Sequence, residues 1–345
     1  MPVPRTSRRP SGGRARLGRV AIAATAWAAV TGLAACAGYT TESTAQPRSL
    51  GAAVPVPDSV EAVSFLGDAL YRPELPDDVL AVYTERYEEA EDALAESPED
   101  VDALIWMGRR TAYLGHHRDA IDIYTDAMTL HPDDARLYRH RGHRYVTVRE
   151  LDNAIADFER AVELTADRPD EVEPDGLPNR LGVPTSTLHF NIWYHLGLAH
   201  YLKGDLAAAL EAYRSCLAAS VHPDSVVATS YWLYMTLRRL GMDGEAAAVL
   251  ENIHADMDII ESTGYLDLLL LHKGERTLED VIGPAGADAT LQSTTTSYGL
   301  GVWQLLDGRH DEARATFERT RTGQSQWAAF GFIAAEAELA RWEER

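Results

Sequence analysis

Lysine, cysteine and aromatic residues are scarce in this chain. Among 32 basic residues only Lys203 and Lys273 are lysines, and 53 Asp and Glu residues set the formal net charge to −21. Nucleic-acid binding needs a basic surface that neutralises phosphates, so this composition argues against it. The apolar run at residues 20–33 is shorter than the roughly 20 residues that a membrane-spanning helix requires. We therefore expect neither a general nucleic-acid-binding protein nor a stable membrane span at this run.

The motifs of common enzyme families are also missing. The chain has no G-x-S-x-G, P-loop, dinucleotide fingerprint or H-E-x-x-H. Of its twelve histidines, His140 and His143 form the close pair with ligand spacing on one helix face, but Arg139, Arg141 and Arg144 around them oppose a cation. The carboxylates fall mainly on expected helix surfaces. The sequence therefore predicts no catalysis, no cofactor and no metal site.

The first 35 residues have the pattern of an export signal. Six arginines and no acidic residue precede the apolar run, which is rich in small residues. The run ends in Leu33-Ala34-Ala35-Cys36, which resembles the bacterial lipoprotein box. That resemblance implies that residues 1–35 are removed and that Cys36 becomes an acylated N-terminus. An ordinary signal peptide with an incidental cysteine is the alternative. Without the signal, 26 basic residues remain and the net charge is −27.

The composition of residues 36–57, rich in Thr, Ser, Ala, Gly and Pro, predicts a flexible tether. Its lipid would be attached at Cys36. Lipoproteins of this type carry three acyl chains, which anchor far better than one. Ala37, where an aspartate favours retention in the inner membrane, implies the outer membrane facing the periplasm if the cell has two membranes. In a cell with one membrane, we expect the outer face of the plasma membrane. Residues 58–345 should then lie outside the cytoplasm.

Residues 101–134 have the pattern of two short amphipathic helices joined by a turn at Gly115. Apolar residues recur at helical spacing in both halves, and Pro132 ends the second helix. Small residues stand where the two helices must approach. A shift of 34 residues maps these positions and one aromatic onto the following stretch: Gly108 onto Gly142, Ala120 onto Ala154, Tyr124 onto Phe158 and Ala127 onto Ala161.

This period and these positions resemble the tetratricopeptide repeat, a helix–turn–helix unit of 34 residues. The resemblance implies an all-α solenoid, because each pair must bury its apolar face against a neighbour like itself. Cys216 falls where Ala127 and Ala161 fall in their repeats, so we expect it to be a small buried spacer. We expect about six units, near residues 101–134, 135–168, 190–223, 227–259, 260–293 and 294–327.

Capping segments and one insertion complete the expected array over residues 58–345. Helices are expected at residues 58–70 and 77–96, the latter as a leading cap, and at residues 324–341 as a C-terminal cap. An insertion at residues 166–188 contains four prolines and no periodicity. Long loops of this kind are uncommon unless they bind something or are disordered. We therefore expect either a specificity loop folded over one mouth of the groove or a tolerated insertion.

The tetratricopeptide family lines its concave groove mainly with positions two, five, nine, twelve and thirteen of each first helix. Carried onto this chain, these positions include a basic and aromatic set: Arg109, Arg136, Arg139, His143, Tyr194, Tyr201, Tyr231, Arg238 and Arg239. Arginine forks pair bidentately with carboxylates, and tyrosines supply rigid contact area. We expect the groove to bind acidic or carboxylate-bearing segments of partners. The alternative is that the arginines only balance acidic neighbours between repeats.

Two resemblances bear on the partner. The carboxylate clamp of chaperone-binding members uses lysine and asparagine where this chain has Ile105 and Arg109, so that partner is not implied. The C-terminal half resembles NlpI-type envelope adaptor lipoproteins at residues 231–234 and 274–278 and at Asp307-Gly308. We therefore expect a membrane-anchored adaptor or assembly scaffold that binds envelope proteins. An unrecognised enzyme using the insertion and His143, or a carrier of small acidic ligands, is the alternative. Association between copies of the chain is left open.

Overall fold

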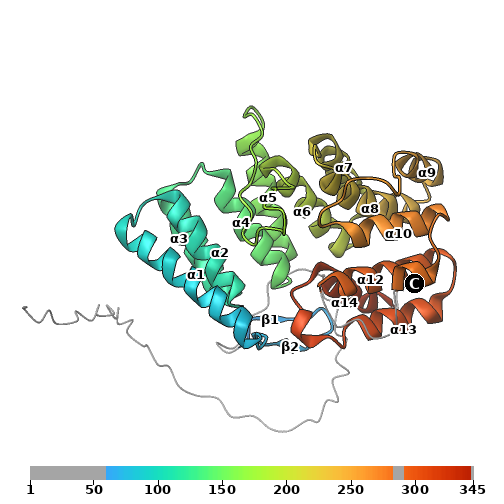
Figure 1. Ribbon diagram of the computed structural model, residues 1–345, viewed down its shortest axis with the longest axis horizontal. Coiled ribbons are helices and arrows are strands. Elements are labelled where there is room, and N and C mark those ends of the chain that lie inside the picture. The colour runs from blue at the N-terminus through green and yellow to red at the C-terminus, as the bar shows by residue number, and fades with distance from the viewer. Residues whose placement is uncertain (1–59, 283–290, 343–345) are drawn as a thin grey trace, which may run out of the picture. The chain divides into compact units, whose positions relative to one another are not determined.

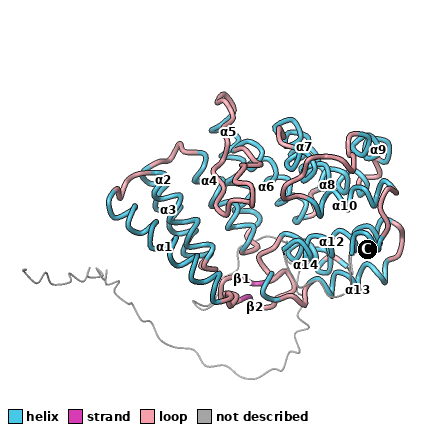
Figure 2. The backbone as a smooth tube through the Cα atoms, in the orientation of Figure 1, coloured by secondary structure: helices cyan, strands magenta, loops and turns pink. Residues whose placement is uncertain are grey.

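The computed structural model describes residues 60–282 and 291–342. All of them lie in one compact unit, Pro47–Arg345. The predicted signal at residues 1–35, Cys36 and the tether at residues 36–57 lie outside the described residues. Helices make up most of the described chain (Figure 2), with one two-stranded hairpin. Among these residues, none of the helices is both long and apolar enough to cross a membrane.

The helices follow one another as antiparallel pairs (Figure 1). After α1 (Asp77–Glu96), six pairs succeed one another: α2 (Val101–Tyr113) and α3 (His117–Leu130), α4 (Ala135–Thr147) and α5 (Leu151–Thr165), α6 (Leu188–Lys203) and α7 (Leu206–Ala219), α8 (Pro223–Arg239) and α9 (Asp243–Glu251), α10 (Thr263–Lys273) and α11 (Leu278–Ile282), α12 (Leu291–Leu306) and α13 (His310–Thr320). The last helix is α14 (Phe330–Ala340). This confirms the expected all-α solenoid of about six units with caps.

A glycine facing an aromatic ring sets the distance between the helices in four of the six pairs. A Cβ atom at Gly108 would lie 2.5 Å from the Tyr124 ring, and one at Gly142 would lie 2.8 Å from the Phe158 ring. The same contact recurs between Gly197 and Tyr213 and between Gly301 and Phe317. Only glycine lets the first helix of these pairs approach the second this closely. The 34-residue period seen in the sequence is thus a packing period.

The predicted helix at residues 58–70 is wrong. Strands β1 (Ala62–Val63) and β2 (Ala69–Leu70) form an antiparallel hairpin here, with Ala62 opposite Leu70. Between the strands Gly67 has a φ of 93°, and the Ser64 Oγ accepts hydrogen bonds from the backbone N–H groups of Leu66 and Asp68. These local bonds compete with a helix. The apolar side of the hairpin packs against Trp327 and Phe332 near the C-terminus.

The expected final helix at residues 324–341 is shorter than predicted. A 3-10 turn at Gln324–Gln326 comes first, Ala329 is extended, and α14 begins only at Phe330. The break lets the Trp327 indole donate a hydrogen bond to the Tyr71 carbonyl oxygen at 2.8 Å. Packing against the N-terminal hairpin therefore replaces the first turns of the predicted helix.

The N-terminal hairpin and α14 lie side by side in Figure 1, and an ion pair joins this region to the second repeat. The Arg149 guanidinium, in the turn between α4 and α5, pairs with the Glu336 carboxylate of α14 at 2.9 Å, and both side chains are buried. Arg149 also donates a hydrogen bond to the Trp327 carbonyl oxygen at 2.7 Å. We call the contacts among Arg149, Trp327 and Glu336 the clasp. It connects the early units of the array to its C-terminal helix.

Candidate functional site

A cavity of about 410 Å³ lies between the first helices of several units. Its walls come from α4, α6, the start of α10, α12 and the segment before α14: His143, Tyr194, Glu261, Ser262, Gly264, Tyr265, Thr295, Ala328, Ala329 and Phe330. Each of α4, α6, α10 and α12 is the first helix of its pair. The resemblance assigned the groove to the first helices. The volume falls within the roughly 300–1,000 Å³ of ordinary ligand pockets.

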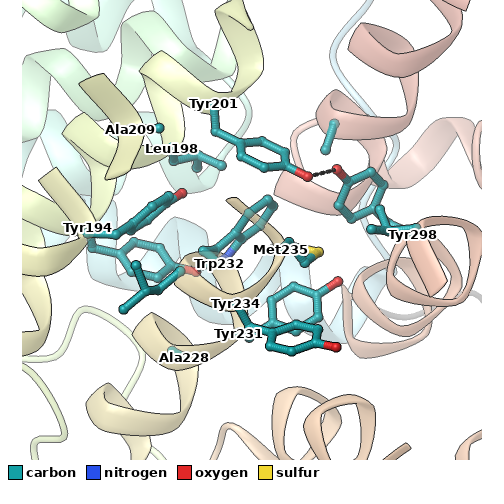
Figure 3. Packing of buried hydrophobic residues seen from close by; sticks show 14 of the residues in the cluster. Tyr194, Leu198, Tyr201, Ala209, Ala228, Tyr231, Trp232, Tyr234, Met235 and Tyr298 are labelled. Carbon is teal, nitrogen blue, oxygen red and sulfur yellow. Dashed lines mark hydrogen bonds between the residues drawn. The ribbon is translucent and has the colours of Figure 1, made fainter. Parts of the chain in front are cut away.

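Aromatic rings form much of the cavity wall, and they hold one another in place. The His143 ring lies 4.5 Å from the His195 ring and 5.3 Å from the Phe330 ring, between centroids. The Tyr194 hydroxyl accepts a hydrogen bond from the Trp232 indole at 2.8 Å and lies 3.1 Å from the Tyr265 hydroxyl. Figure 3 shows Tyr194 beside Trp232 in the main core. The wall is therefore a preformed part of the core.

The titratable rings of the cavity are uncharged at neutral pH. Burial, with the nearby Arg144 and His195, lowers the pKa of His143 well below its ordinary value. Burial likewise raises the pKa of Tyr194 well above its ordinary value. Both groups stay neutral because charging them would cost desolvation energy that no contact returns. The cavity can hold apolar or aromatic groups, with Tyr194 and Tyr265 hydroxyls as polar contacts.

Beyond the cavity, a basic cluster lies between α2, α4 and the insertion. The Arg139 Nε atom forms an ion pair with the Glu173 carboxylate at 2.9 Å. Arg109 donates to the Pro174 carbonyl oxygen at 2.9 Å, and its guanidinium lies 4.4 Å from the Trp106 ring centroid. The insertion is thus folded over Arg109 of the first unit and Arg139 of the second, and its role as a specificity loop or a tolerated insertion stays a prediction.

The predicted groove residues do not form one continuous surface. His143 and Tyr194 line the cavity, whereas Arg109 and Arg139 lie under the insertion. The remaining five are distributed between the core and surface ion pairs: Tyr201 and Tyr231 are buried, Arg239 pairs with Glu338, Arg136 with Asp102 and Asp134, and Arg238 with Asp243.

The C-terminal helices explain this division. Tyr298 of α12 donates a hydrogen bond to the Tyr201 hydroxyl at 3.0 Å (Figure 3), and Glu338 of α14 pairs with Arg239. These contacts cover residues that an open groove would expose. Arg136, Arg238 and Arg239 each form an ion pair with a carboxylate of the same chain. Partner binding through the nine residues remains a prediction.

Sequence position did not single out Arg144, which the structure adds to the basic cluster. Over residues 60–282 and 291–342, its side chain forms no hydrogen bond or ion pair. Burial lowers its pKa, and the charges of Arg139 and Arg109 lower it further, while Tyr124 and Tyr113 raise it. An arginine remains protonated despite such shifts. Arg144 is therefore a cation that a carboxylate could satisfy. Its place in the sequence, next to the groove position His143, is the signal that points to it.

The two histidines at ligand spacing have separate surroundings. The His140 ring stacks on Tyr124 at 5.9 Å between centroids, whereas His143 faces His195. In the part of the chain that the structure describes, no group of three or more His, Cys, Asp or Glu residues could hold a metal ion.

Cys216, the expected spacer, is fully buried beside the Thr229 hydroxyl, and burial raises the pKa of its thiol to about 12.

Comparisons with known proteins agree with the repeat pattern. Residues 187–220, which contain α6 and α7, match the family model described as tetratricopeptide repeat. The BBSome complex member BBS4 of Bos taurus is 27% identical over 141 residues, which are 41% of this chain and 23% of that protein. This chain therefore matches less than a quarter of the length of that relative.

Two solved structures resemble the chain at low sequence identity. YrrB, described as a TPR protein with an unusual peptide-binding site, is 16% identical, with 68% of this chain and 92% of that chain covered and a TM-score of 0.39. The MamA protein is 17% identical, with 59% and 98% covered and a TM-score of 0.37. The chain is thus an all-α solenoid of helix pairs, and the pair at residues 187–220 matches the tetratricopeptide repeat.

Proposed function

We propose that this chain is a membrane-anchored adaptor or assembly scaffold that binds proteins of the cell envelope. The observation that carries the proposal is the cavity whose walls come from α4, α6, α10 and α12. Four first helices of a tetratricopeptide-repeat array converge on one preformed pocket. Such arrays use the surface of their first helices to bind other proteins, and a pocket that takes one anchoring side chain is how most interfaces concentrate their affinity.

The chemistry of the site indicates which kind of partner segment would bind there. The neutral aromatic wall of the cavity fits an apolar or aromatic side chain, and Arg144 beside His143 on α4 can pair with a carboxylate. A partner segment with an apolar anchor and an acidic residue would use both. The strongly negative chain repels acidic segments elsewhere on its surface, so such a segment is directed to this basic region.

The export signal and the lipoprotein box support the location. In the proposed mature protein, residues 1–35 are absent, acylated Cys36 anchors the chain, and residues 36–57 tether the array to the membrane. The array then faces the periplasm from the outer membrane if the cell has two membranes. Otherwise it lies on the outer face of the plasma membrane.

Filling the cavity tests the proposal. Ala328 lines the cavity and is partly exposed, so Ala328→Trp places an indole in it without enlarging a fully buried residue. Ala207→Trp on the exposed side of α7 is the matched control. Affinity capture from an envelope extract should recover partners with the wild type and the control, and at least about tenfold less with Ala328→Trp. This loss corresponds to about 1.4 kcal/mol of binding free energy.

Both variants should keep the wild-type melting temperature, so that the loss reports on the cavity. Equal capture by the two variants would remove the cavity from the binding site. Capture of no envelope protein by the wild type would argue against an adaptor.

A further inference from the structure

The insertion places one acidic stretch, Glu173-Pro174-Asp175-Gly176, on the basic cluster of the first two units. We call residues 173–176 the acidic segment. Glu173 pairs with Arg139 at 2.9 Å, and Arg109 donates to the Pro174 carbonyl oxygen at 2.9 Å. Arg110 donates to the Gly176 carbonyl oxygen at 2.8 Å. Arginines of α2 and α4 therefore bind one carboxylate and two backbone carbonyl oxygens of the segment. A groove that binds an extended peptide makes contacts of the same kind.

The acidic segment is seated closely. Glu173 is 8% exposed, and its carboxylate also accepts a hydrogen bond from the Asn191 amide of α6 at 3.1 Å. A Cβ atom at position 176 would lie 1.6 Å from the Tyr113 hydroxyl oxygen, so a larger residue fits there only if Tyr113 moves. Val172 and Thr187 form an antiparallel bridge at the base of the insertion. These contacts hold the segment against the groove.

The charges explain why an acidic segment binds here. Burial lowers the pKa of Arg139. The Glu173 carboxylate opposes this effect, and the charge of Arg109 adds to it. Asp175 lies close enough to Arg109 for that charge to oppose the rise in its pKa that burial causes. The segment thus supplies the negative charge that the arginines of α2 and α4 need. It does not reach Arg144, which no described residue pairs with.

We propose that the acidic segment is a resident ligand in cis, which occupies the groove's site for an acidic, extended segment of a partner protein. A partner binds by displacing it. The proposal rests on the proposed adaptor function and specifies the regulation of its groove. Because the segment is part of the chain, its effective concentration is high, on the order of millimolar for short flexible connections. Weak acidic peptides are excluded, and only a partner with further contacts, such as one to Arg144, displaces it.

A peptide supplied in trans tests the occupancy. In the test variant of the full chain, residues 172–177 are replaced by an equally long Gly-Ser stretch. The probe is a fluorescent peptide with the sequence of residues 170–178, and its binding is measured by anisotropy. The emptied variant should bind the peptide at least about tenfold more tightly than the wild type, whose site is already filled.

Two arginine substitutions in the emptied variant locate the bound peptide. Arg139→Gln should weaken peptide binding at least about tenfold, because it removes the partner of the peptide's glutamate. Arg214→Gln is the matched control, since Arg214 is an exposed arginine of α7 outside the groove. It should leave binding unchanged. Equal losses for the two substitutions would show nonspecific attraction and overturn the proposal.

A single substitution covers the case in which the replaced insertion prevents folding. Gly176→Ala introduces the Cβ clash with Tyr113 and should release the segment, so that the peptide binds more tightly than to the wild type. The resident-ligand proposal is overturned if the peptide binds a folded variant, either the Gly-Ser replacement or Gly176→Ala, no more tightly than it binds the wild type. It is also overturned if the peptide shows no saturable binding to either protein. No envelope partner enters this measurement, so its failure is distinct from failure of the cavity test.

Discussion

Arg149 has a left-handed backbone, with a φ of 69°, in the turn between α4 and α5. The corresponding turn of the first unit has Gly115, and glycines with positive φ occupy the same turn in the other units. A residue with a Cβ costs about 1–2 kcal/mol in this conformation. The Arg149 side chain, 3% exposed, pairs with fully buried Glu336. The contacts of the Arg149 side chain in the clasp offset the strain of its backbone.

Substitution of Arg149 by glycine should therefore destabilise the protein, although glycine suits the turn. It relieves about 1–2 kcal/mol of backbone strain, but leaves Glu336 as an uncompensated buried charge, at a cost of about 3–5 kcal/mol. We expect a net loss of about 1–4 kcal/mol in the free energy of unfolding, measured by urea denaturation.

Neutralising the orphaned carboxylate provides the control for the clasp. Adding Glu336→Gln to Arg149→Gly should recover part of the lost stability, because an amide is less costly to bury than an unpaired carboxylate. An Arg149→Gly protein as stable as the wild type, or more stable, would contradict the role assigned to the clasp.

At the scale of elements, α4 and α6 pack buried, uncharged histidines against each other and their neighbours. Burial lowers the pKa of His195 to about 3, with the Arg139 charge adding to the effect. Burial also lowers the pKa of His140 well below its ordinary value, and again Arg139 adds to it. These rings have no acidic partner strong enough to favour protonation. The packing of the two helices therefore depends on neutral imidazoles.

Acidification should weaken this packing before carboxylates titrate. A histidine in the unfolded chain has a pKa of about 6.5, whereas folded His195 has a pKa of about 3. As pH falls below about 6.5, the unfolded state binds protons that the folded state does not, and stability falls. Between pH 7.5 and 5.5, His195 alone should remove about 1.4 kcal/mol from the free energy of unfolding.

The pH dependence of urea denaturation measures this effect. His195→Gln should reduce the loss of stability between pH 7.5 and 5.5 by about 1.4 kcal/mol, whatever its effect at pH 7.5. His310→Gln, at an exposed histidine of α13, should leave the loss unchanged. The same pH slope for the wild type and His195→Gln would show that His195 titrates normally in the folded protein.

At the scale of the whole molecule, the proposed lipid anchor determines where the array acts. Cys36→Ser should release the protein from membranes into the soluble fraction and abolish labelling by radioactive fatty acid, because no acceptor thiol remains at the lipoprotein box. Cys216→Ser is the matched control: its thiol is buried in the array, so membrane association and labelling should persist. Membrane fractionation of Cys36→Ser at the wild-type level would exclude Cys36 as the anchor.

The repeat unit was predictable from the sequence because its contacts are local. Gly108 packs on Tyr124, sixteen positions along the chain, and the same spacing recurs at Gly142 and Phe158. A helix pair closes on itself through such contacts, so the periodicity of small and aromatic residues encodes it. The sequence by itself therefore determined the all-α solenoid of repeated helix pairs.

Contacts between distant segments were decided only by the tertiary structure. Trp327 meets Tyr71, and Arg149 meets Glu336, across separations of 256 and 187 residues. No periodicity relates such positions, and the curvature of stacked pairs, which brings them together, is a sum of small rotations. Those contacts accompany a hairpin at residues 62–70 and a shorter last helix. They also divided the predicted groove into a cavity, buried core and an arginine cluster occupied by the acidic segment.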